Sequence, residues 1–150
     1  MEVKELGHVV FYVRNIERSR RFYRDVLGWR ELPGMPANMP IAAFSSGRTH
    51  HELLLIEVGE DAAAQPQGRR VGLYHIGLKV GESDEELREA LRTLQAAGAT
   101  IVGSSDHGVT HSLYIHDPDG NEIELYIDVQ PAVWKEHPEA MFAPIQPLRL

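Results

Sequence analysis

The chain has 150 residues and a formal net charge of −7, so it fits one domain with a full hydrophobic core. Its acidity does not suit nucleic acid or anionic membrane as a partner. It has no cysteine but eight histidines, which excludes disulfides, thiolate metal sites and a cysteine nucleophile and leaves imidazole and carboxylate groups as metal ligands.

Residues 1–7 lack the basic segment and apolar core of a signal peptide. No apolar run approaches the roughly 18 residues that a membrane span needs. We therefore expect a cytoplasmic protein without a membrane or nucleic-acid partner.

The first half of the sequence predicts a strand, a helix and three more strands. Residues 7–13 form an apolar run rich in Val, Phe and Tyr, which is typical of a strand. A helix is predicted from the N-cap residue Asn15 to Gly28, with apolar residues three and four positions apart. Further strands are predicted over residues 29–32, 42–46 and 52–58, with a loop at 33–40.

The second half repeats this order after a linker at residues 61–70. It predicts a strand over 73–80, a helix from the capping box of Ser83 and Glu86 to Gly98, and strands over 100–102, 112–116 and 122–127. The last two strands flank the turn sequence DPDGN at 117–121. We therefore predict one α+β domain over residues 1–150, built of two tandem βαβββ modules at about 5–60 and 71–128 and followed by an irregular tail at 129–150.

Strand alternation predicts which side chains share a face. By this rule His8, His75 and Glu124 all lie opposite the aliphatic residues of their strands. We expect the aliphatic faces to meet the helices and the polar faces to line a common space. Two imidazoles and one carboxylate leave coordination positions open, which suits Fe(II) or Mn(II). Each residue taken singly would also fit an ordinary rim or surface position.

Four segments carry a resemblance to a known superfamily: GHV at 7–9, FYRDVLG at 22–28, HIG at 75–77 and YIHDPDGNEIE at 114–124. They are similar to the vicinal oxygen chelate proteins, which include glyoxalases, bleomycin-resistance proteins, fosfomycin-resistance thiol transferases and extradiol dioxygenases. The resemblance covers nearly all of residues 5–128. It implies a curved mixed sheet around a metal-centred cleft, with His8, His75 and Glu124 as the metal ligands.

Three further features resemble extradiol ring-cleaving dioxygenases. His51, in the pair His50-His51, matches their acid–base histidine, and His107 matches a histidine in one of their loops. Tyr114 lies ten residues before Glu124, as a tyrosine near the substrate does in that family. The resemblance implies an enzyme dependent on Fe(II), or alternatively Mn(II), that opens a catechol-type aromatic diol with O₂. His51, His107 and Tyr114 would be its catalytic residues, and we expect a homodimer because the best-known members carry two copies of the fold.

Three alternatives stay open. A glyoxalase-like isomerase or lyase generally uses a fourth ligand on the fourth strand, where alternation places Leu53, Leu55 and Glu57 on the face of His51 and Glu52 on the other, so no fourth ligand is expected. A fosfomycin-type thiol transferase uses the same ligand set. A bleomycin-resistance-like protein would bind a small molecule without a metal. The loop at 33–40 and the tail at 134–142 are the predicted specificity elements.

Overall fold

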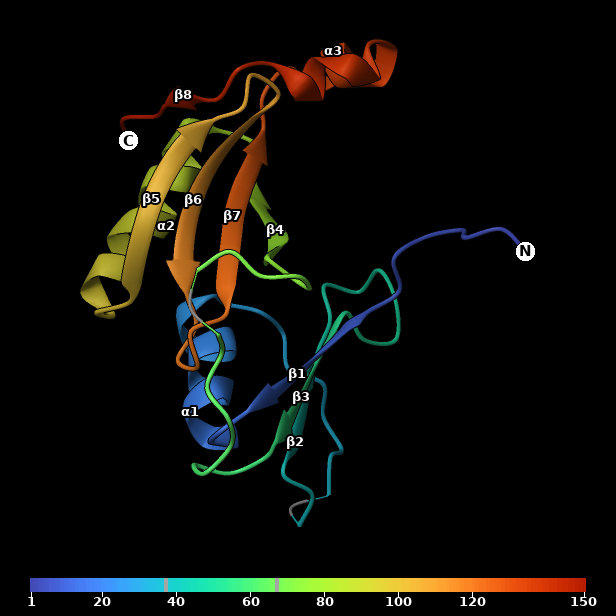
Figure 1. The fold of residues 1–150 in the computed structure, drawn as a ribbon, viewed down its shortest axis with the longest axis vertical. Helices are drawn as coiled ribbons and strands as arrows, with labels where there is room; N and C mark the ends of the chain where they lie inside the picture. The colour runs from blue at the N-terminus through green and yellow to red at the C-terminus, as the bar shows by residue number, and fades with distance from the viewer. Residues whose placement is uncertain (37, 67) are drawn as a thin grey trace. The chain divides into compact units, whose positions relative to one another are not determined.

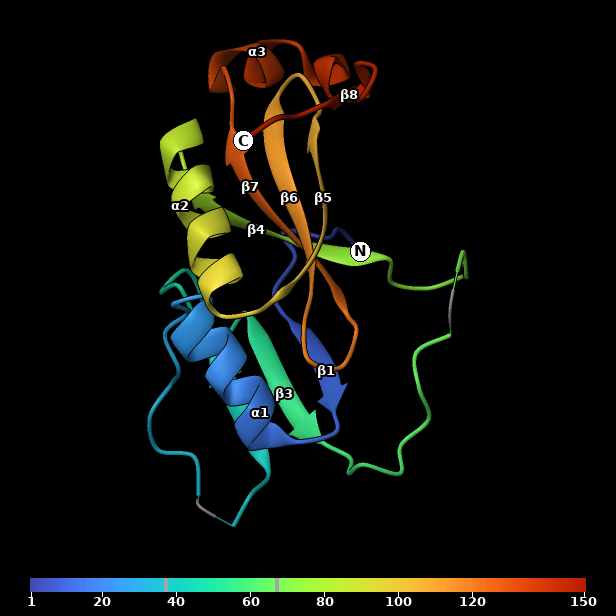
Figure 2. The same ribbon diagram turned by 90° about the vertical axis from the view of Figure 1, so that its left-hand side faces the viewer.

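The computed structural model describes residues 1–36, 38–66 and 68–150. The chain divides into two compact units, Met1–Gln65 and Pro66–Leu150, and each unit holds a mixed sheet and a helix packed on it (Figures 1 and 2). The fold is therefore α+β, as predicted, with two separate mixed sheets. The predicted loop and linker each include one position outside the described residues, Ala37 and Gln67. Among the described helices, none has the length and apolar content to cross a membrane.

The sheet of the first unit has the strand order β1–β3–β2. Strand β3 (Leu53–Glu57) pairs in parallel with β1 (Val9–Val13) and antiparallel with β2 (Ile41–Phe44). The register puts Phe11 beside Leu55 and Phe44 beside Leu53, and all four side chains are buried. They form the core under helix α1 (Ile16–Arg21), which contacts β2 and β3.

Helix α1 begins where the sequence predicts it. Asn15 has extended backbone angles, and its side-chain oxygen accepts a hydrogen bond from the backbone N–H of Arg18 at 2.9 Å, which satisfies one of the free donors of the first turn. The helix continues as a π-helical turn, η1 (Phe22–Val26). Gly28 then takes a φ of +69°, a left-handed conformation that glycine adopts without steric cost.

The strand predicted at residues 29–32 is wrong. Within the described residues this segment makes only an isolated bridge between Glu31 and Phe44, although the N–H of Leu32 donates to the carbonyl of Ala43 at 2.8 Å. Pro33 follows at once and has no N–H to donate, so the ladder stops after one step.

The sheet of the second unit has the order β4–β7–β6–β5–β8. The pair β4–β7 is parallel and the other pairs are antiparallel. The strands run over His75–Gly81 (β4), Thr100–Asp106 (β5), Thr110–His116 (β6), Glu122–Asp128 (β7) and Gln146–Pro147 (β8).

Helix α2 (Asp84–Ala96) covers one face of this sheet (Figure 2). Leu87 and Leu94 are its buried residues, and they meet the aliphatic face made by every second residue of β6 and β7, where Leu113, Ile115, Ile123, Leu125 and Ile127 are buried. The predicted capping box is present, since Ser83 Oγ accepts from the N–H of Glu86 and donates to Glu86 Oε2. The opposite face of the sheet is the polar one.

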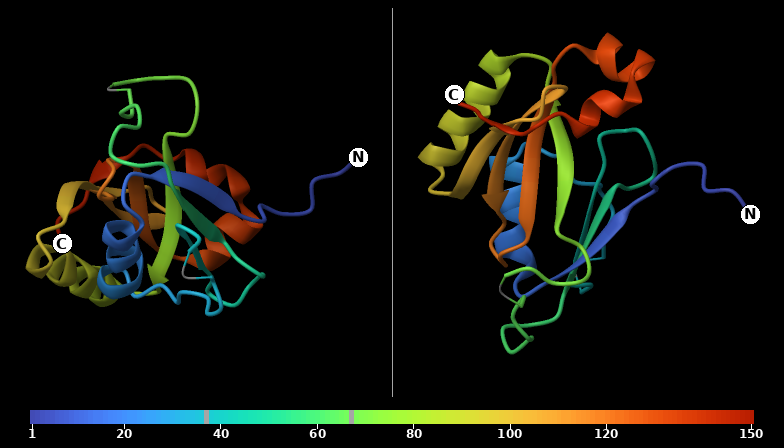
Figure 3. Two further views of the ribbon diagram at one scale, coloured as in Figure 1. Left: turned by 90° about the horizontal axis from the view of Figure 1, so that it is seen from below. Right: turned by 45° about the horizontal axis from the view of Figure 1, so that its top comes forward.

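The tail is more regular than predicted. It contains α3 (Pro131–Glu136), a 3₁₀ turn η2 (Pro138–Phe142) and the short strand β8, which pairs with the end of β5. Ser104 Oγ donates to the carbonyl of Leu148 at 2.8 Å. Figure 3 shows this segment across the end of the sheet at which β7 ends. A distant contact creates β8, whereas α3 and η2 have local hydrogen bonds and a proline in the first turn of each, a helix-start signal that the sequence reasoning did not use.

Candidate metal and substrate site

The polar face of the second sheet gathers the predicted site residues of this unit. Every second side chain of β4, β7 and β6 lies on the face opposite α2. Gly77 and Tyr114 both pair with Glu124 in the ladders, so these three residues share that face. A Cβ on Gly77 would lie 3.4 Å from the ring of Tyr126 and 3.6 Å from Glu124 Oε2, at ordinary contact distance. The residues of this face on these strands are His75, Gly77, Lys79, Thr110, Ser112, Tyr114, His116, Glu122, Glu124, Tyr126 and Asp128.

His75 and Glu124 form the closest pair of predicted ligands. His75 Nε2 lies 3.2 Å from Glu124 Oε2, and both side chains are mostly buried. Two donor atoms that each lie about 2.1 Å from one metal, at bond angles near 90–110°, are about 3.0–3.4 Å apart. The pair therefore has the spacing of two neighbouring ligands of one ion.

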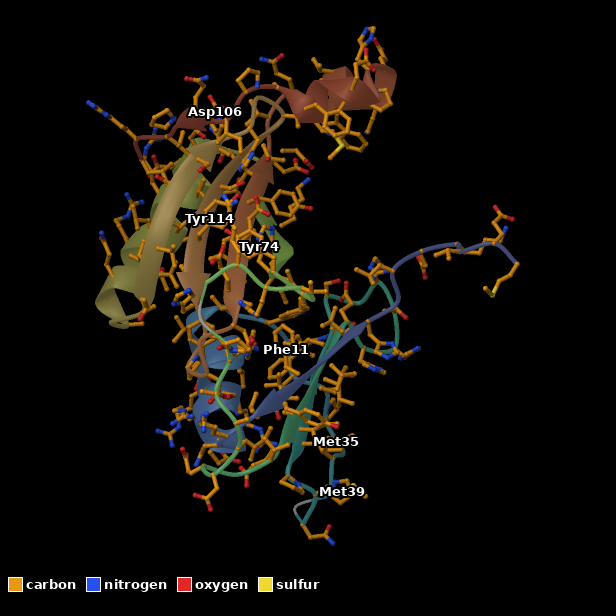
Figure 4. The ribbon with its side chains drawn as sticks, viewed as in Figure 1. Phe11, Met35, Met39, Tyr74, Asp106 and Tyr114 are labelled. Carbon is orange, nitrogen blue, oxygen red and sulfur yellow. The ribbon has the colours of Figure 1, made fainter. Side chains whose placement is uncertain are left out.

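Tyr114 joins the same carboxylate to His107. Its hydroxyl lies 3.2 Å from Glu124 Oε1 and 2.8 Å from His107 Nε2. Burial and the negative charge of Glu124 raise the pKa of Tyr114 well above its usual value, so the phenol keeps its proton. The hydroxyl can donate to Glu124 and accept from His107 when His107 carries its proton on Nε2. Figure 4 labels Tyr114 in the middle of this sheet, with Tyr74 near it.

Two further residues around His75 were missed by the sequence reasoning. Glu122 lies opposite His75 in the β4–β7 ladder, with its Oε1 3.8 Å from His75 Nδ1, and the His75 Nδ1 atom is buried without a hydrogen-bond partner. A hydrogen bond to Glu122, together with burial, raises the pKa of Tyr74. The alternation along β7 could have predicted this role, because it places Glu122 on the same face as Glu124. Glu122 is in the right place to orient His75.

The first unit brings three histidines together. The rings of His8 and His51 lie 4.4 Å apart between centroids, and those of His8 and His50 lie 6.0 Å apart. His50 Nδ1 and His51 Nδ1 are 2.6 Å apart, so one of them donates and the other accepts. Arg48 holds this arrangement by donating to the carbonyls of Leu6 and Gly7, each at 3.2 Å.

Electrostatics favour the neutral form of His51. Burial lowers its pKa, and repulsion by His8 and His50 lowers it further. A neutral imidazole is the form that accepts a proton. His51 therefore has the protonation state that a general base requires near neutral pH.

The structure corrects the predicted faces of β3. Leu53 and Leu55 are buried in the core, and it is Leu54 that stands beside Val10 on the face opposite α1. The pairs Val9–Leu53 and Ile76–Ile123 are equivalent in the two modules, so Leu54 holds the position that Glu124 holds in the second unit. Its alkyl side chain offers no ligand, as the sequence predicted on other grounds.

The predicted ligands are thus divided between the two units, with His75 and Glu124 in one and His8 in the other. Over residues 1–36, 38–66 and 68–150, no three His, Asp or Glu side chains are grouped closely enough to hold an ion by themselves. The His75–Glu124 pair fits a divalent metal by its donor types and spacing. Of the other histidines, His111 Nδ1 lies 2.6 Å from Asp84.

Comparison with protein families gives one match over most of the chain. Residues 5–125 match the model of the glyoxalase/bleomycin resistance protein/dioxygenase superfamily.

Curated relatives include a catechol-2,3-dioxygenase of Bacillus subtilis, 33% identical over 94% of this chain and 47% of its own length. An iron-dependent extradiol dioxygenase of Rhodococcus jostii is 33% identical over 80% of this chain and 42% of its length. The chain therefore spans about half the length of these two relatives. A probable lactoylglutathione lyase of Synechocystis is 28% identical over 80% of this chain and 92% of its length.

The fold is also that of solved structures of this kind. A glyoxalase/bleomycin resistance protein/dioxygenase domain from Frankia superposes with a TM-score of 0.68 at 24% identity, over 85% of this chain and all of that one. This likeness concerns the fold alone.

Proposed function

The chain belongs to the glyoxalase/bleomycin resistance protein/dioxygenase superfamily, and from that premise we propose that it is an Fe(II)- or Mn(II)-dependent extradiol dioxygenase that opens a catechol-type diol with O₂. The observation that carries the proposal is the contact of Glu124 with both His75 and Tyr114, at 3.2 Å each. One carboxylate thus meets a candidate ligand on one side and a proton donor for the substrate on the other.

We propose His8, His75 and Glu124 as the metal ligands. The donor types and the 3.2 Å spacing support the last two. His8 is proposed because it precedes Val9 of the Val9–Leu53 pair as His75 precedes Ile76 of the equivalent Ile76–Ile123 pair. The motifs around both histidines also resemble the family pattern. A bound Fe(II) or Mn(II) would supply open coordination positions for a diol and O₂.

The remaining side chains have distinct roles in this proposal. Tyr114 is held protonated by its raised pKa, and when the diol binds, its single hydroxyl proton turns from Glu124 to a substrate oxygen. His107 lies 2.8 Å from the Tyr114 hydroxyl and holds it in place. His51, held neutral by its lowered pKa, takes the proton from the diol hydroxyl. We also propose that the active form is a homodimer, as the resemblance to family members with two copies of the fold led us to expect.

The direct test is metal analysis combined with a panel of catechols. The protein is purified without oxygen, loaded with Fe(II) or Mn(II), and mixed with O₂ and each diol. We expect about one metal per chain and a yellow ring-opened product, and Glu124→Gln should abolish metal uptake. Protein that takes up no metal, or that takes it up and opens no catechol, contradicts the proposal.

A lyase is the second candidate, because the match to the Synechocystis relative covers 92% of that protein's length. Leu54 counts against it, since this position of the first module would have to supply a fourth ligand and is apolar. A metal-loaded protein that isomerises a thiohemiacetal and leaves catechols unchanged would establish this alternative. Thiol transfer to fosfomycin, or binding of a small molecule without metal, would establish the other two.

A further inference from the structure

A cavity of about 390 Å³ extends from Glu124 along the polar face of β7 to Asp128. It belongs wholly to the second unit. Its walls come from Tyr126 of β7, from Val109 in the turn between β5 and β6, and from the C-terminal tail, through Trp134, Pro138 and Met141. Glu124 and Asp128, at its two ends, are four residues apart on β7, a distance of about 13 Å at about 3.3 Å per residue. The cavity has room for an aromatic ring at the Glu124 end and a substituent that points toward Asp128.

The polarity of the lining side chains determines which kind of ring substituent the cavity can bind. Apolar and aromatic side chains line the space between the two ends, and both ends carry a carboxylate. The nearby cation Lys79 is already paired, with its Nζ 2.8 Å from Asp128 Oδ2 and 3.2 Å from Glu82. An apolar group gains affinity when it leaves water for such a wall, whereas a substrate carboxylate would meet two like charges without a free cation.

We propose that this cavity binds the ring substituent of the substrate, and that the substrate class is an uncharged catechol with an apolar substituent rather than a carboxylated one. This inference rests on the proposed function for the position of the diol at Glu124. The tail segment 131–142 is then a specificity element that closes one side of the substrate cavity.

The binding test uses Trp134 as its reporter. The chain has two tryptophans, and Trp29 lies among the rings of Tyr23 and Phe44 in the first unit. Trp29→Phe therefore leaves Trp134 as the sole tryptophan, and it is excited selectively over the tyrosines. The metal-loaded protein is titrated without oxygen with 3-butylcatechol and with 2,3-dihydroxybenzoate. A fully buried methylene is worth about fourfold in affinity, and we expect 3-butylcatechol to bind at least about tenfold more tightly than the carboxylate and to quench Trp134.

Three variants make the test specific. Met141→Ala removes a cavity wall and should weaken binding of 3-butylcatechol, whereas Phe142→Ala, at an adjacent and largely exposed residue outside the lining, should not. Asp128→Asn removes one carboxylate and leaves Lys79 less neutralised, so it should raise the affinity for 2,3-dihydroxybenzoate severalfold. Equal affinity of the two ligands, or equal effects of Met141→Ala and Phe142→Ala, would overturn the inference.

The two proposals fail in different ways. Ring opening of 3-butylcatechol and 2,3-dihydroxybenzoate with equal kcat/KM would contradict the inference and leave the dioxygenase proposal standing. Selective quenching of Trp134 by 3-butylcatechol in a metal-loaded protein that opens no ring would support the cavity and contradict the dioxygenase.

Discussion

Tyr114 on β6 and Glu124 on β7 occupy directly opposite positions in an antiparallel ladder, and the Tyr114 hydroxyl lies 3.2 Å from Glu124 Oε1. The register of one strand pair therefore joins a proton donor to a candidate metal ligand. Because the raised pKa keeps Tyr114 protonated near neutral pH, its hydroxyl donates to Glu124 in this contact.

Tyr114→Phe removes the hydroxyl and keeps the ring. We expect kcat for catechol opening to fall by about 10²–10³-fold, the usual effect of losing one donor to a developing oxyanion, while metal content stays at its wild-type value. Product absorbance and metal analysis measure the two quantities. Tyr12→Phe, at an exposed position of β1, is the control. An unchanged kcat in Tyr114→Phe would remove Tyr114 from the mechanism.

Glu122→Gln tests the orientation of His75. His75 Nδ1 is buried and lacks a partner, and Glu122 Oε1 is the carboxylate 3.8 Å from it. Loss of such a supporting group typically costs 10–100-fold in metal affinity, and we expect a decrease of about that size in a metal titration. Glu89→Gln, which removes the same charge from the exposed surface of α2, should leave the affinity unchanged. Equal affinities in both variants would show that Glu122 does not support the ligand.

His51→Gln tests the proposed general base. We expect turnover to fall by about 10²–10⁴-fold with metal content retained. His50→Gln is the control variant, because it keeps a hydrogen-bonding group beside His51 Nδ1. The decrease in turnover in His50→Gln should be much smaller than in His51→Gln. Rates measured at saturating 3-butylcatechol compare the two variants, and a larger loss in His50→Gln would transfer the role to His50.

Asp117→Ala tests the turn that sets the β6–β7 register. The buried carboxylate of Asp117 accepts from the backbone N–H of Asp119 at 2.9 Å and of Asn121 at 2.8 Å. Leaving buried donors without a partner costs about 1–3 kcal/mol, and urea denaturation should show a decrease in the free energy of unfolding of that size. Pro118→Ala, at an exposed position of the same turn, should cost less. Equal losses would show that the carboxylate does not hold the turn.

The capping box of α2 predicts a dependence of stability on pH. Hydrogen bonds from the backbone N–H of Glu82 and the hydroxyl of Ser83 lower the pKa of Glu86 below 4.5. A lowered carboxyl pKa contributes stability above the unfolded value, and this stability is lost as pH falls through the folded value. Wild type should therefore be more stable than Glu86→Gln at about pH 7, with the difference shrinking below pH 4.5. A difference that does not change with pH would contradict the role of the charge.

The helix caps and the turn could be predicted because their hydrogen bonds join residues only a few positions apart. Asn15, Ser83 with Glu86, and the turn at 117–121 each hold their partners three or four positions away, so the order of residues is enough to predict them. Side-chain alternation on β7 separated Glu124 from Ile123 for the same reason. The predictions for 29–32 and for β8 were wrong because the order of these segments depends on distant partners such as Ala43 and Asp106. The helical turns of the tail were missed although Pro131 and Pro138 stand in their first turns.

By itself the sequence determined the duplicated α+β architecture and the polar face on which Glu124 lies, and its lack of cysteine left imidazole and carboxylate groups as candidate metal ligands. Only the tertiary structure decided that Glu124 contacts both His75 and Tyr114, that Glu122 stands beside His75, and that the tail closes a cavity over β7. The physical reason is that strand periodicity assigns a side chain to a face, whereas the register between strands distant in sequence assigns its neighbours.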